Sequence, residues 1–271
     1  MEDSVARPAP PQTIYHYTSQ QGLLGIIQQR ALWVSSIRHL NDAAESQFAI
    51  EIMKEQLKPS PEDDPNIWTP FFDQVSNYFD VMKDADSLVG SFSEEGDQLG
   101  QWRAYTGGGV GFSIGFDFRG IRDLADAQMF SIQQCAYTPE EHNKIIAGLI
   151  SATRQALRKR DVEHADLICT GGLLLLAPRL KHPSFAEEKE WRIVTPVTKA
   201  IALKFTIGKS MIIPYGEFKF ANDDGKMPIV EIVVGPAPHM QLSVESVERL
   251  LSASGLGHVS VRPSSVPFRN W

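Results

Sequence analysis

The spacing of apolar residues predicts short strands and amphipathic helices along the chain. Aromatic and β-branched residues alternate over Thr13–Thr18, which is typical of a strand. Thr18 and Gln21 have the spacing of a capping box, and the apolar residues at 23, 24, 26 and 27 predict a helix that ends at Arg30. A second strand is expected over 31–35.

The same patterns continue to the C-terminus. Helices are expected from Asp42 to Leu57 and over 71–79, 98–105, 139–160, 161–179 with a break near Gly171–Gly172, and from Ser243 onward. Strands are expected over 88–93, 110–116, 129–137, 190–197, 210–213, 229–234 and 258–262, with a surface loop at 59–65. Many short strands with helices clustered between them, and no regular βαβ alternation, predict an α+β fold. We expect residues 1–12 to form a mobile leader and residues 13–271 to form one domain.

Composition narrows the class of protein. The 271 residues include 26 Lys and Arg against 33 Asp and Glu, a net charge of −7, which argues against a standing affinity for nucleic acid without excluding a local basic groove. The 2 cysteines have no metal-binding spacing and are too few for a disulfide framework, so a reducing cytoplasm is expected. No apolar run is long enough to span a membrane, and the first residues lack the layout of a secretory signal.

Several familiar motifs are incomplete. Gly208-Lys209-Ser210 lacks the earlier glycine of a phosphate loop, so a turn between strands is expected. The glycines at 107–109 precede a strand rather than a helix, unlike a dinucleotide fingerprint. The 7 histidines have no paired spacing, and we expect no metal site.

The first candidate cluster lies on the first strand. Its alternation places His16 and Thr18 on one face and Tyr15 and Tyr17 on the other. A neutral imidazole at His16 could donate a hydrogen bond to a ribose hydroxyl, or it could be a core histidine with one backbone partner. Asn41-Asp42, with an acid three residues on, is interpreted as a helix cap.

Two further clusters follow. Trp102 and Tyr105 are three residues apart, so they are expected on one helix face, either as a surface for a planar ring or as an ordinary core stripe. Glu188, Glu190 and Arg192 alternate into a strand and would point the same way. That pattern is typical of a solvated edge, although two neighbouring carboxylates also favour contact with a cation or a ligand.

Ordered motifs across the chain resemble a known family. YHYTS and LND near the start, SFSEE and QW in the middle, and EKEWRIV, IVVGP and VPFR towards the end are similar to a bacterial family of unknown function numbered 2971, from about Ile14 to Arg269. More distantly, the order of strand, histidine, capped helix and late Glu-x-Glu resembles the ADP-ribosyltransferase fold. That resemblance implies central antiparallel sheets with helices clustered around them.

The second resemblance also implies roles for individual residues. His16 matches the histidine that binds a ribose hydroxyl of NAD, and Glu190, with Glu188 as the preceding acid, matches the glutamate that holds the ribose as nicotinamide leaves. The resemblance implies that His16, Glu188 and Glu190 line one sugar-binding pocket. The remaining candidates for binding NAD are Tyr17, Thr18, Trp33, Ser35, Trp102, Tyr105 and Arg192. The Ser-Thr-Ser pattern of the superfamily is replaced by Ser35-Ser36.

Three functions follow as hypotheses. The first is an NAD-dependent ADP-ribosyltransferase, a bacterial toxin or phage-defence effector that modifies a protein or a nucleic acid and has an antitoxin or regulatory partner. The second, suggested by the missing Ser-Thr-Ser pattern, is a non-catalytic nucleotide-sensing or partner-binding module. The third is a nuclease or phosphotransferase that uses His16, together with Arg103, Arg192 and the carboxylates, on phosphate.

Overall fold

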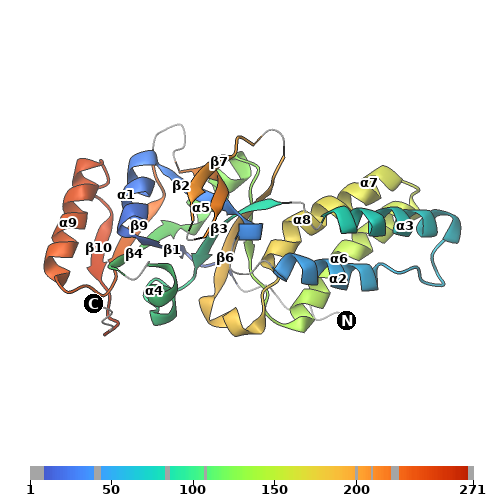
Figure 1. Cartoon of the computed structure of the whole chain (residues 1–271), viewed down its shortest axis with the longest axis horizontal. Helices are drawn as coiled ribbons and strands as arrows, with labels where there is room; N and C mark the ends of the chain where they lie inside the picture. Colours follow the sequence, from blue (N-terminus) through green and yellow to red (C-terminus); the bar gives the residue numbers. More distant parts are fainter. Residues whose placement is uncertain are drawn as a thin grey trace. The chain divides into compact units, whose positions relative to one another are not determined.

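The structure is a computed structural model that describes residues 9–39, 44–82, 86–106, 109–198, 201–208, 210–220 and 226–267. It contains helices and a large mixed sheet, which confirms the predicted α+β class (Figure 1). Contacts within the chain define two compact units. The first combines Met1–Leu32, Ser91–Gln128 and Phe218–Trp271, and the second combines Trp33–Gly90 and Met129–Glu217.

The first unit is built on β1 (Thr13–Ser19), the predicted opening strand. It pairs antiparallel with β4 (Gly111–Asp117) along its whole length, and β4 pairs antiparallel with β9 (Ile229–Val234). β10 (Ser260–Pro263) then runs parallel to β9, so the sheet is mixed rather than wholly antiparallel. On its other edge β1 meets the end of β3 (Ser87–Ser93) at Tyr15 opposite Ser93.

Helices complete this unit. They are α1 (Gln20–Gln29), α4 (Leu99–Tyr105), α5 (Phe118–Ala127) and α9 (Met240–Ala253). In α5 the buried residues Phe118, Ile121 and Ala125 recur at helical spacing, which explains why this segment forms a helix with one apolar face.

The strands of the second unit pair around β3. β2 (Ala31–Ser36) lies antiparallel to it, and β8 (Ile212–Lys219) lies between β2 and β7 (Lys204–Ile207). β6 (Glu190–Pro196) also pairs with β3 and carries β5 (Ser131–Gln134) antiparallel on its other side.

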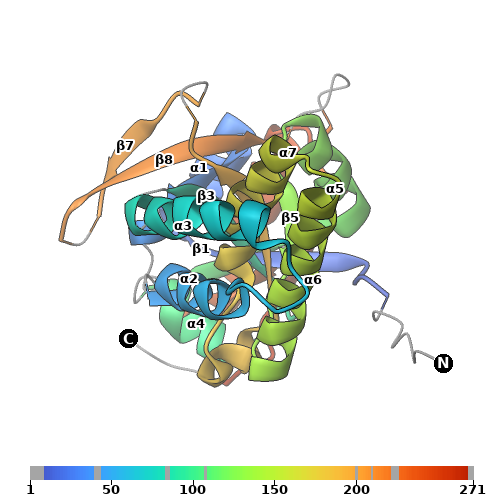
Figure 2. The same ribbon diagram turned by 90° about the vertical axis from the view of Figure 1, so that its right-hand side faces the viewer.

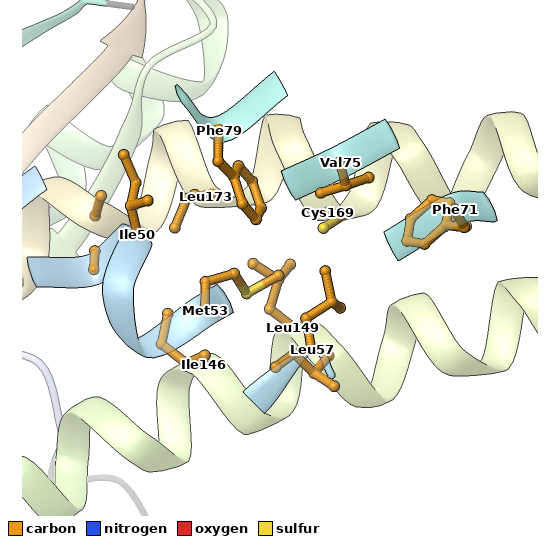
Figure 3. Close-up of a cluster of buried hydrophobic side chains, with 14 of the residues drawn as sticks. Ile50, Met53, Leu57, Phe71, Val75, Phe79, Ile146, Leu149, Cys169 and Leu173 are labelled. Carbon is orange, nitrogen blue, oxygen red and sulfur yellow. The ribbon is translucent and has the colours of Figure 1, made fainter. Parts of the chain in front are cut away.

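The rest of the second unit is helical (Figure 2). It comprises α2 (Ala44–Gln56), α3 (Pro65–Met82), α6 (Pro139–Arg158), α7 (Val162–Asp166), a π-helix at Leu167–Gly171, α8 (Gly172–Leu176), and 3₁₀ turns at Ile37–His39, Ala177–Arg179 and Pro183–Glu188. Apolar side chains from these helices form one core, which includes Met53, Leu57, Phe71, Val75, Phe79, Ile146, Leu149, Cys169 and Leu173 (Figure 3).

The π-helix explains the predicted break near Gly171–Gly172. A Cβ at Gly172 would lie 2.4 Å from Leu149 Cδ1, so glycine allows the close approach to α6.

The helix after β1 begins one residue later than predicted. Ser19, not Thr18, is the N-cap, and its hydroxyl accepts a hydrogen bond of 3.2 Å from the amide of Gly22. Because α1 starts at Gln20, the residue directly before its first turn is Ser19, which still pairs with Gly111 as the last residue of β1. Thr18 lies one residue further back, buried opposite Phe112 on β4.

Other predicted boundaries also shift. α3 is longer than the expected 71–79, β5 is shorter than 129–137, α9 starts at Met240 rather than Ser243, and β10 starts at Ser260. The expected strand at 210–213 is the start of the longer β8, and β7 before it was not predicted. The Asp42 cap lies outside the described residues. The loop at 59–65 is not only a surface loop, because the Asp63 carboxylate is buried against Arg154.

Among the described helices, none combines the length and the apolar character that a membrane span requires. Gly208 lies between β7 and β8, as expected, and its amide donates a hydrogen bond of 2.9 Å to the carbonyl oxygen of Met211.

Candidate functional site

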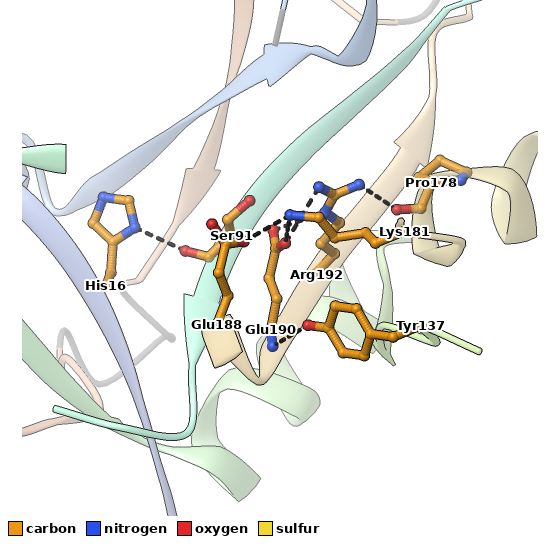
Figure 4. Close-up of polar contacts among 8 residues, drawn as sticks. All are labelled: His16, Ser91, Tyr137, Pro178, Lys181, Glu188, Glu190 and Arg192. Carbon is orange, nitrogen blue, oxygen red and sulfur yellow. Dashed lines mark hydrogen bonds and ion pairs between the residues drawn. The ribbon is translucent and has the colours of Figure 1, made fainter. Parts of the chain in front are cut away.

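His16 lies in the middle of β1, opposite Ile114 on β4. Its Nδ1 is 2.9 Å from the carbonyl oxygen of Ser91 (Figure 4). Its ring also meets the ring of Phe92 edge-on. A carbonyl oxygen can only accept, so Nδ1 carries the proton and Nε2 presents a lone pair. Burial lowers the pKa of His16, which the contact with Ser91 only partly offsets, and the ring is neutral at pH 7.

In this tautomer the free ring nitrogen of His16 accepts a hydrogen bond, whereas the sequence suggested that it would donate one. A ribose hydroxyl near Nε2 would donate to the ring rather than accept from it. Within the described part of the chain, Ser91 is the hydrogen-bond partner that the structure gives to His16. The imidazole is therefore a fixed, neutral hydrogen-bond acceptor.

The opposite face of β1 is a packed aromatic cluster. Tyr15 and Tyr17 share this face, as predicted, and the Tyr17 ring lies 4.7 Å from that of Trp102 in an edge-on contact. The Tyr17 hydroxyl donates to the carbonyl oxygen of Glu95 at 2.7 Å, and the Trp102 indole donates to Asp97 at 2.8 Å. Tyr17 and Trp102 are thus core residues with satisfied polar atoms.

Trp102 and Tyr105 do not form one exposed surface. Trp102 is buried, whereas Tyr105 at the end of α4 is exposed. The expectation of a shared face fails because residues three apart on a helix differ by about 60° in direction, enough to separate a core position from a surface position. In the second unit, Trp33 is also exposed and stacks on Tyr215 at 4.3 Å. Of the four candidate rings, Trp33 and Tyr105 are the two that solvent reaches.

Two polar candidates are part of strand ladders. Thr18 is buried opposite Phe112, and Ser35 pairs with Val89 in the second unit. The backbones of both residues are therefore paired with neighbouring strands.

The two candidate acids belong to the second unit and do not lie on one strand. Glu188 ends a 3₁₀ turn, Lys189 adopts a left-handed conformation with φ of 45°, and Glu190 begins β6. Both carboxylates nevertheless bind the same ammonium group. Lys181 Nζ is 2.7 Å from Glu188 Oε2 and 2.6 Å from Glu190 Oε2 (Figure 4).

Arg192 completes a buried ion cluster of Lys181, Glu188, Glu190 and Arg192. Its Nε donates to Glu190 Oε1 at 2.7 Å, and its guanidinium also donates to the carbonyl oxygen of Pro178. Lys181 and Arg192 are each 1% exposed and Glu190 is 5% exposed. The solvated edge that the charge pattern suggested is therefore wrong: this face is inside, because each carboxylate finds a cation there.

The contacts in the cluster favour the charged forms of Glu190 and Lys181. Burial alone would raise the pKa of Glu190, but the adjacent Arg192 and Lys181 outweigh it and lower the pKa to about 2. Burial likewise opposes the charged form of Lys181, and the nearby carboxylate of Glu190 raises its pKa above the ordinary value. The cluster contains two acids and two bases, so its formal charges balance.

Backbone hydrogen bonds hold the cluster in place. The amide of Lys181 donates to Ala136 at 2.9 Å, and the amide of Glu190 donates to the Tyr137 hydroxyl at 2.8 Å. The amide of Cys135 donates to the carbonyl oxygen of Glu190 at 2.9 Å. Sequence patterns indicated neither Lys181 nor Tyr137, because both reach the acids through contacts between separate segments.

The structure argues against Arg192 as a phosphate ligand. The nuclease or phosphotransferase hypothesis gave it that role, but its buried guanidinium already donates to Glu190 and Pro178. Among the described residues, no group of three or more His, Cys, Asp or Glu side chains is arranged to hold a metal ion.

The comparisons with known proteins agree with the family suggested by the sequence motifs. The model of a family described as "Protein of unknown function (DUF2971)" matches residues 101–193, a segment that includes Glu188, Glu190 and Arg192. No curated protein matches the chain.

One solved structure is similar over most of its length. It is titled "Thermus sp. 2.9 DarT in complex with ADP-ribosylated ssDNA" and shares 15% sequence identity, with 95% of each chain covered and a TM-score of 0.35.

Proposed function

We propose that this protein is an NAD-dependent ADP-ribosyltransferase-like enzyme. The observation that carries the proposal is the state of His16. It is neutral, fixed by Ser91, and presents an acceptor nitrogen from the middle of a strand. A sugar hydroxyl is a suitable donor for such a nitrogen.

The acids supply the second part of the proposed chemistry. The bond between nicotinamide and the ribose breaks, nicotinamide leaves with the bonding electrons, and positive charge develops on the ribose. A carboxylate that holds a ribose hydroxyl stabilises this charge more in the transition state than in the ground state. Glu190 stays ionised at neutral pH. Glu188 is the more accessible of the two carboxylates, with a side chain that is 15% exposed.

The exposure of the aromatic side chains decides which of them could stack on nicotinamide. Trp33 and Tyr105 are the exposed candidates for stacking on nicotinamide. The nucleophile of the acceptor, a protein side chain or a nucleic acid base, attacks the ribose carbon and loses its proton. The proposal includes action in a bacterial cytoplasm as a toxin or phage-defence effector, held in check by an antitoxin or regulatory partner.

The test uses purified full-length protein with NAD labelled on the adenylate phosphate, incubated with bacterial lysate. Nicotinamide release and label incorporation are measured for the wild type, His16→Ala and Glu188→Gln. Loss of a preorganised electrostatic partner should lower the rate on the order of a hundredfold. Digestion of the labelled product with protease or with nuclease identifies the class of acceptor.

The matched control is His239→Ala, which changes an exposed histidine at the start of α9. It should keep the wild-type rate, and thermal unfolding of each variant separates loss of chemistry from loss of fold. Equal nicotinamide release by wild type, His16→Ala and Glu188→Gln would refute the enzymatic proposal.

One observation favours a second candidate, a nucleotide-sensing module without catalysis. The charge of Glu190 is already balanced by two buried cations, so less of it is available to a developing positive charge. This candidate predicts that NAD or ADP-ribose raises the melting temperature of the protein while no nicotinamide is released. Stabilisation at 100-fold excess over Kd is worth about 2.7 kcal/mol, which a thermal-shift assay resolves.

A further inference from the structure

The β7–β8 hairpin exposes an unusual amount of apolar surface. Ile207 is 93% exposed, and Phe205 and Ile212 are each 67% exposed. Figure 2 shows this hairpin extending away from the helices α2, α3 and α6 of the same unit. Exposed apolar side chains gathered on one element, rather than scattered singly, are typical of an interaction surface.

The register of the hairpin gathers these side chains on one face. Phe205 lies opposite Pro214 and Ile207 lies opposite Ile212, so these four side chains point to the same side of the ribbon. Thr206, Ile213 and Tyr215 point to the other side, where Tyr215 stacks on Trp33. One face is thus packed within the unit, and the other face is apolar and exposed.

The outer edge of β7 is also unpaired among the strands that the structure describes, since β7 ends the order β2-β8-β7. The hydrogen bond from the amide of Gly208 to the carbonyl oxygen of Met211 fixes which residues of β7 face β8. Hydrogen-bonded pairs alternate along an antiparallel ladder, so the backbone groups of Thr206 and Lys204 point toward β8. Phe205 and Ile207 therefore direct their amides and carbonyls to the open edge. Pro214, which has no amide proton, lies opposite Phe205, as this alternation requires.

We propose that a second copy of this chain pairs with β7 edge to edge, antiparallel, about a twofold axis at Thr206. Phe205 then lies opposite Ile207 of the other copy, and each such pair forms two backbone hydrogen bonds. All the outward groups of Phe205 and Ile207 are satisfied. An exposed apolar edge strand is a template for pairing of this kind.

The chemistry of β7 fits its own copy. Self-pairing in this register places an aromatic ring against a β-branched side chain and Thr206 against Thr206, both favourable cross-strand combinations. It places no like charges opposite each other. The ammonium of Lys204 is held by Glu217 of its own chain at 2.6 Å and faces Gly208 of the other copy. Four residues with one apolar face supply less than the ~800 Å² per partner of a standard interface, so the dimer is expected to be weak and concentration-dependent.

Sedimentation velocity over a range from low micromolar to several hundred micromolar protein tests the proposal. The wild type should shift from monomer to dimer within this range. Ile207→Lys should remain monomeric at every concentration, because the two lysines would meet the apolar edge and lose solvation. Leu242→Lys is the matched control, since it places the same charge at an exposed leucine of α9, and it should dimerise like the wild type.

Cysteine trapping tests the register. Facing residues in a non-hydrogen-bonded antiparallel pair have Cα atoms about 4.5 Å apart, within reach of a disulfide. Oxidised Thr206→Cys protein should therefore form a covalent dimer on a non-reducing gel, and Lys204→Cys should not. Both native cysteines, Cys135 and Cys169, are buried and should not interfere.

Other outcomes would overturn the proposal. A wild type that stays monomeric throughout would do so, as would an Ile207→Lys variant that still dimerises. A third experiment measures whether the protein floats with vesicles of phosphatidylcholine and phosphatidylglycerol. A monomeric wild type that floats with vesicles, when Ile207→Lys does not, would assign the hairpin to a lipid surface instead of a second copy.

Discussion

Glu190 is an acid that the fold keeps ionised in its interior. Its pKa is about 2 in the folded protein against an ordinary value of 4.5. A carboxyl whose pKa is depressed by folding stabilises the folded state above its unfolded pKa and loses that contribution as the pH falls through the folded pKa. We therefore predict that the free energy of unfolding falls between about pH 5 and pH 2, by on the order of 3 kcal/mol from this residue.

Urea unfolding at a series of pH values checks this prediction. In Glu190→Gln the fall over this window should be smaller, and at pH 7 the variant should be about 3 kcal/mol less stable, because Lys181 and Arg192 remain buried without their acid. Glu248→Gln, at an exposed position on α9, should keep the wild-type pH dependence. The same slope in wild type and Glu190→Gln would contradict the electrostatic account.

At the scale of elements, the start of α1 offers a direct test of the capping residue. Ser19→Ala should destabilise the protein by about 1 kcal/mol, because the amide of Gly22 loses its acceptor. Thr18→Val keeps the shape and the strand preference of the threonine and removes only its hydroxyl. Since Thr18 is not the cap, this change should cost less than Ser19→Ala.

The midpoint of urea unfolding for the two variants measures the difference. A larger loss for Thr18→Val than for Ser19→Ala would restore the capping box that the sequence suggested.

Elements with strong local signals were predictable from the sequence. α6 begins at Pro139 with a complete capping box between Thr138 and Glu141, and its predicted and observed starts coincide. β1 and β9 were also predicted, because their apolar and β-branched residues dominate the local pattern. In these segments local preference and long-range pairing favour the same structure.

The β7–β8 hairpin shows why other elements were missed. Pro214 and Gly216 interrupt the strand pattern, and both are residues that ordinarily weaken a strand. The most apolar residues of β7, Phe205 and Ile207, are also the exposed ones, so alternation does not mark a buried face. Only pairing between the two strands defines this element.

The ion cluster was only partly predictable for a similar reason. The spacing of Glu188, Glu190 and Arg192 indicated charges close together, but not that Lys181 would join the two acids. Lys181 is placed by the bridge between Ala136 and Leu180, two segments that are distant in sequence. No local pattern carries that information, and the burial of Trp102 depends on tertiary packing in the same way.

At the scale of the whole molecule, the two compact units are interleaved in sequence. The chain crosses between them four times, at Leu32/Trp33, Gly90/Ser91, Gln128/Met129 and Glu217/Phe218. Three of these crossings fall inside the strands β2, β3 and β8. A unit that ends inside a strand cannot unfold on its own without breaking the ladder of that strand.

We therefore predict that the chain unfolds in a single cooperative transition, as the expectation of one domain over residues 13–271 requires. Tryptophans lie in both units, with Trp102 and Trp271 in the first and Trp33, Trp68 and Trp191 in the second. Comparison of wild type with Trp102→Phe isolates the fluorescence of Trp102 in the first unit. Far-ultraviolet circular dichroism follows the helices, most of which belong to the second unit. Coincident urea midpoints from all probes are expected for a two-state protein. Two separated midpoints, with the Trp102 signal following only one of them, would show that the units are independent domains despite the strands they divide.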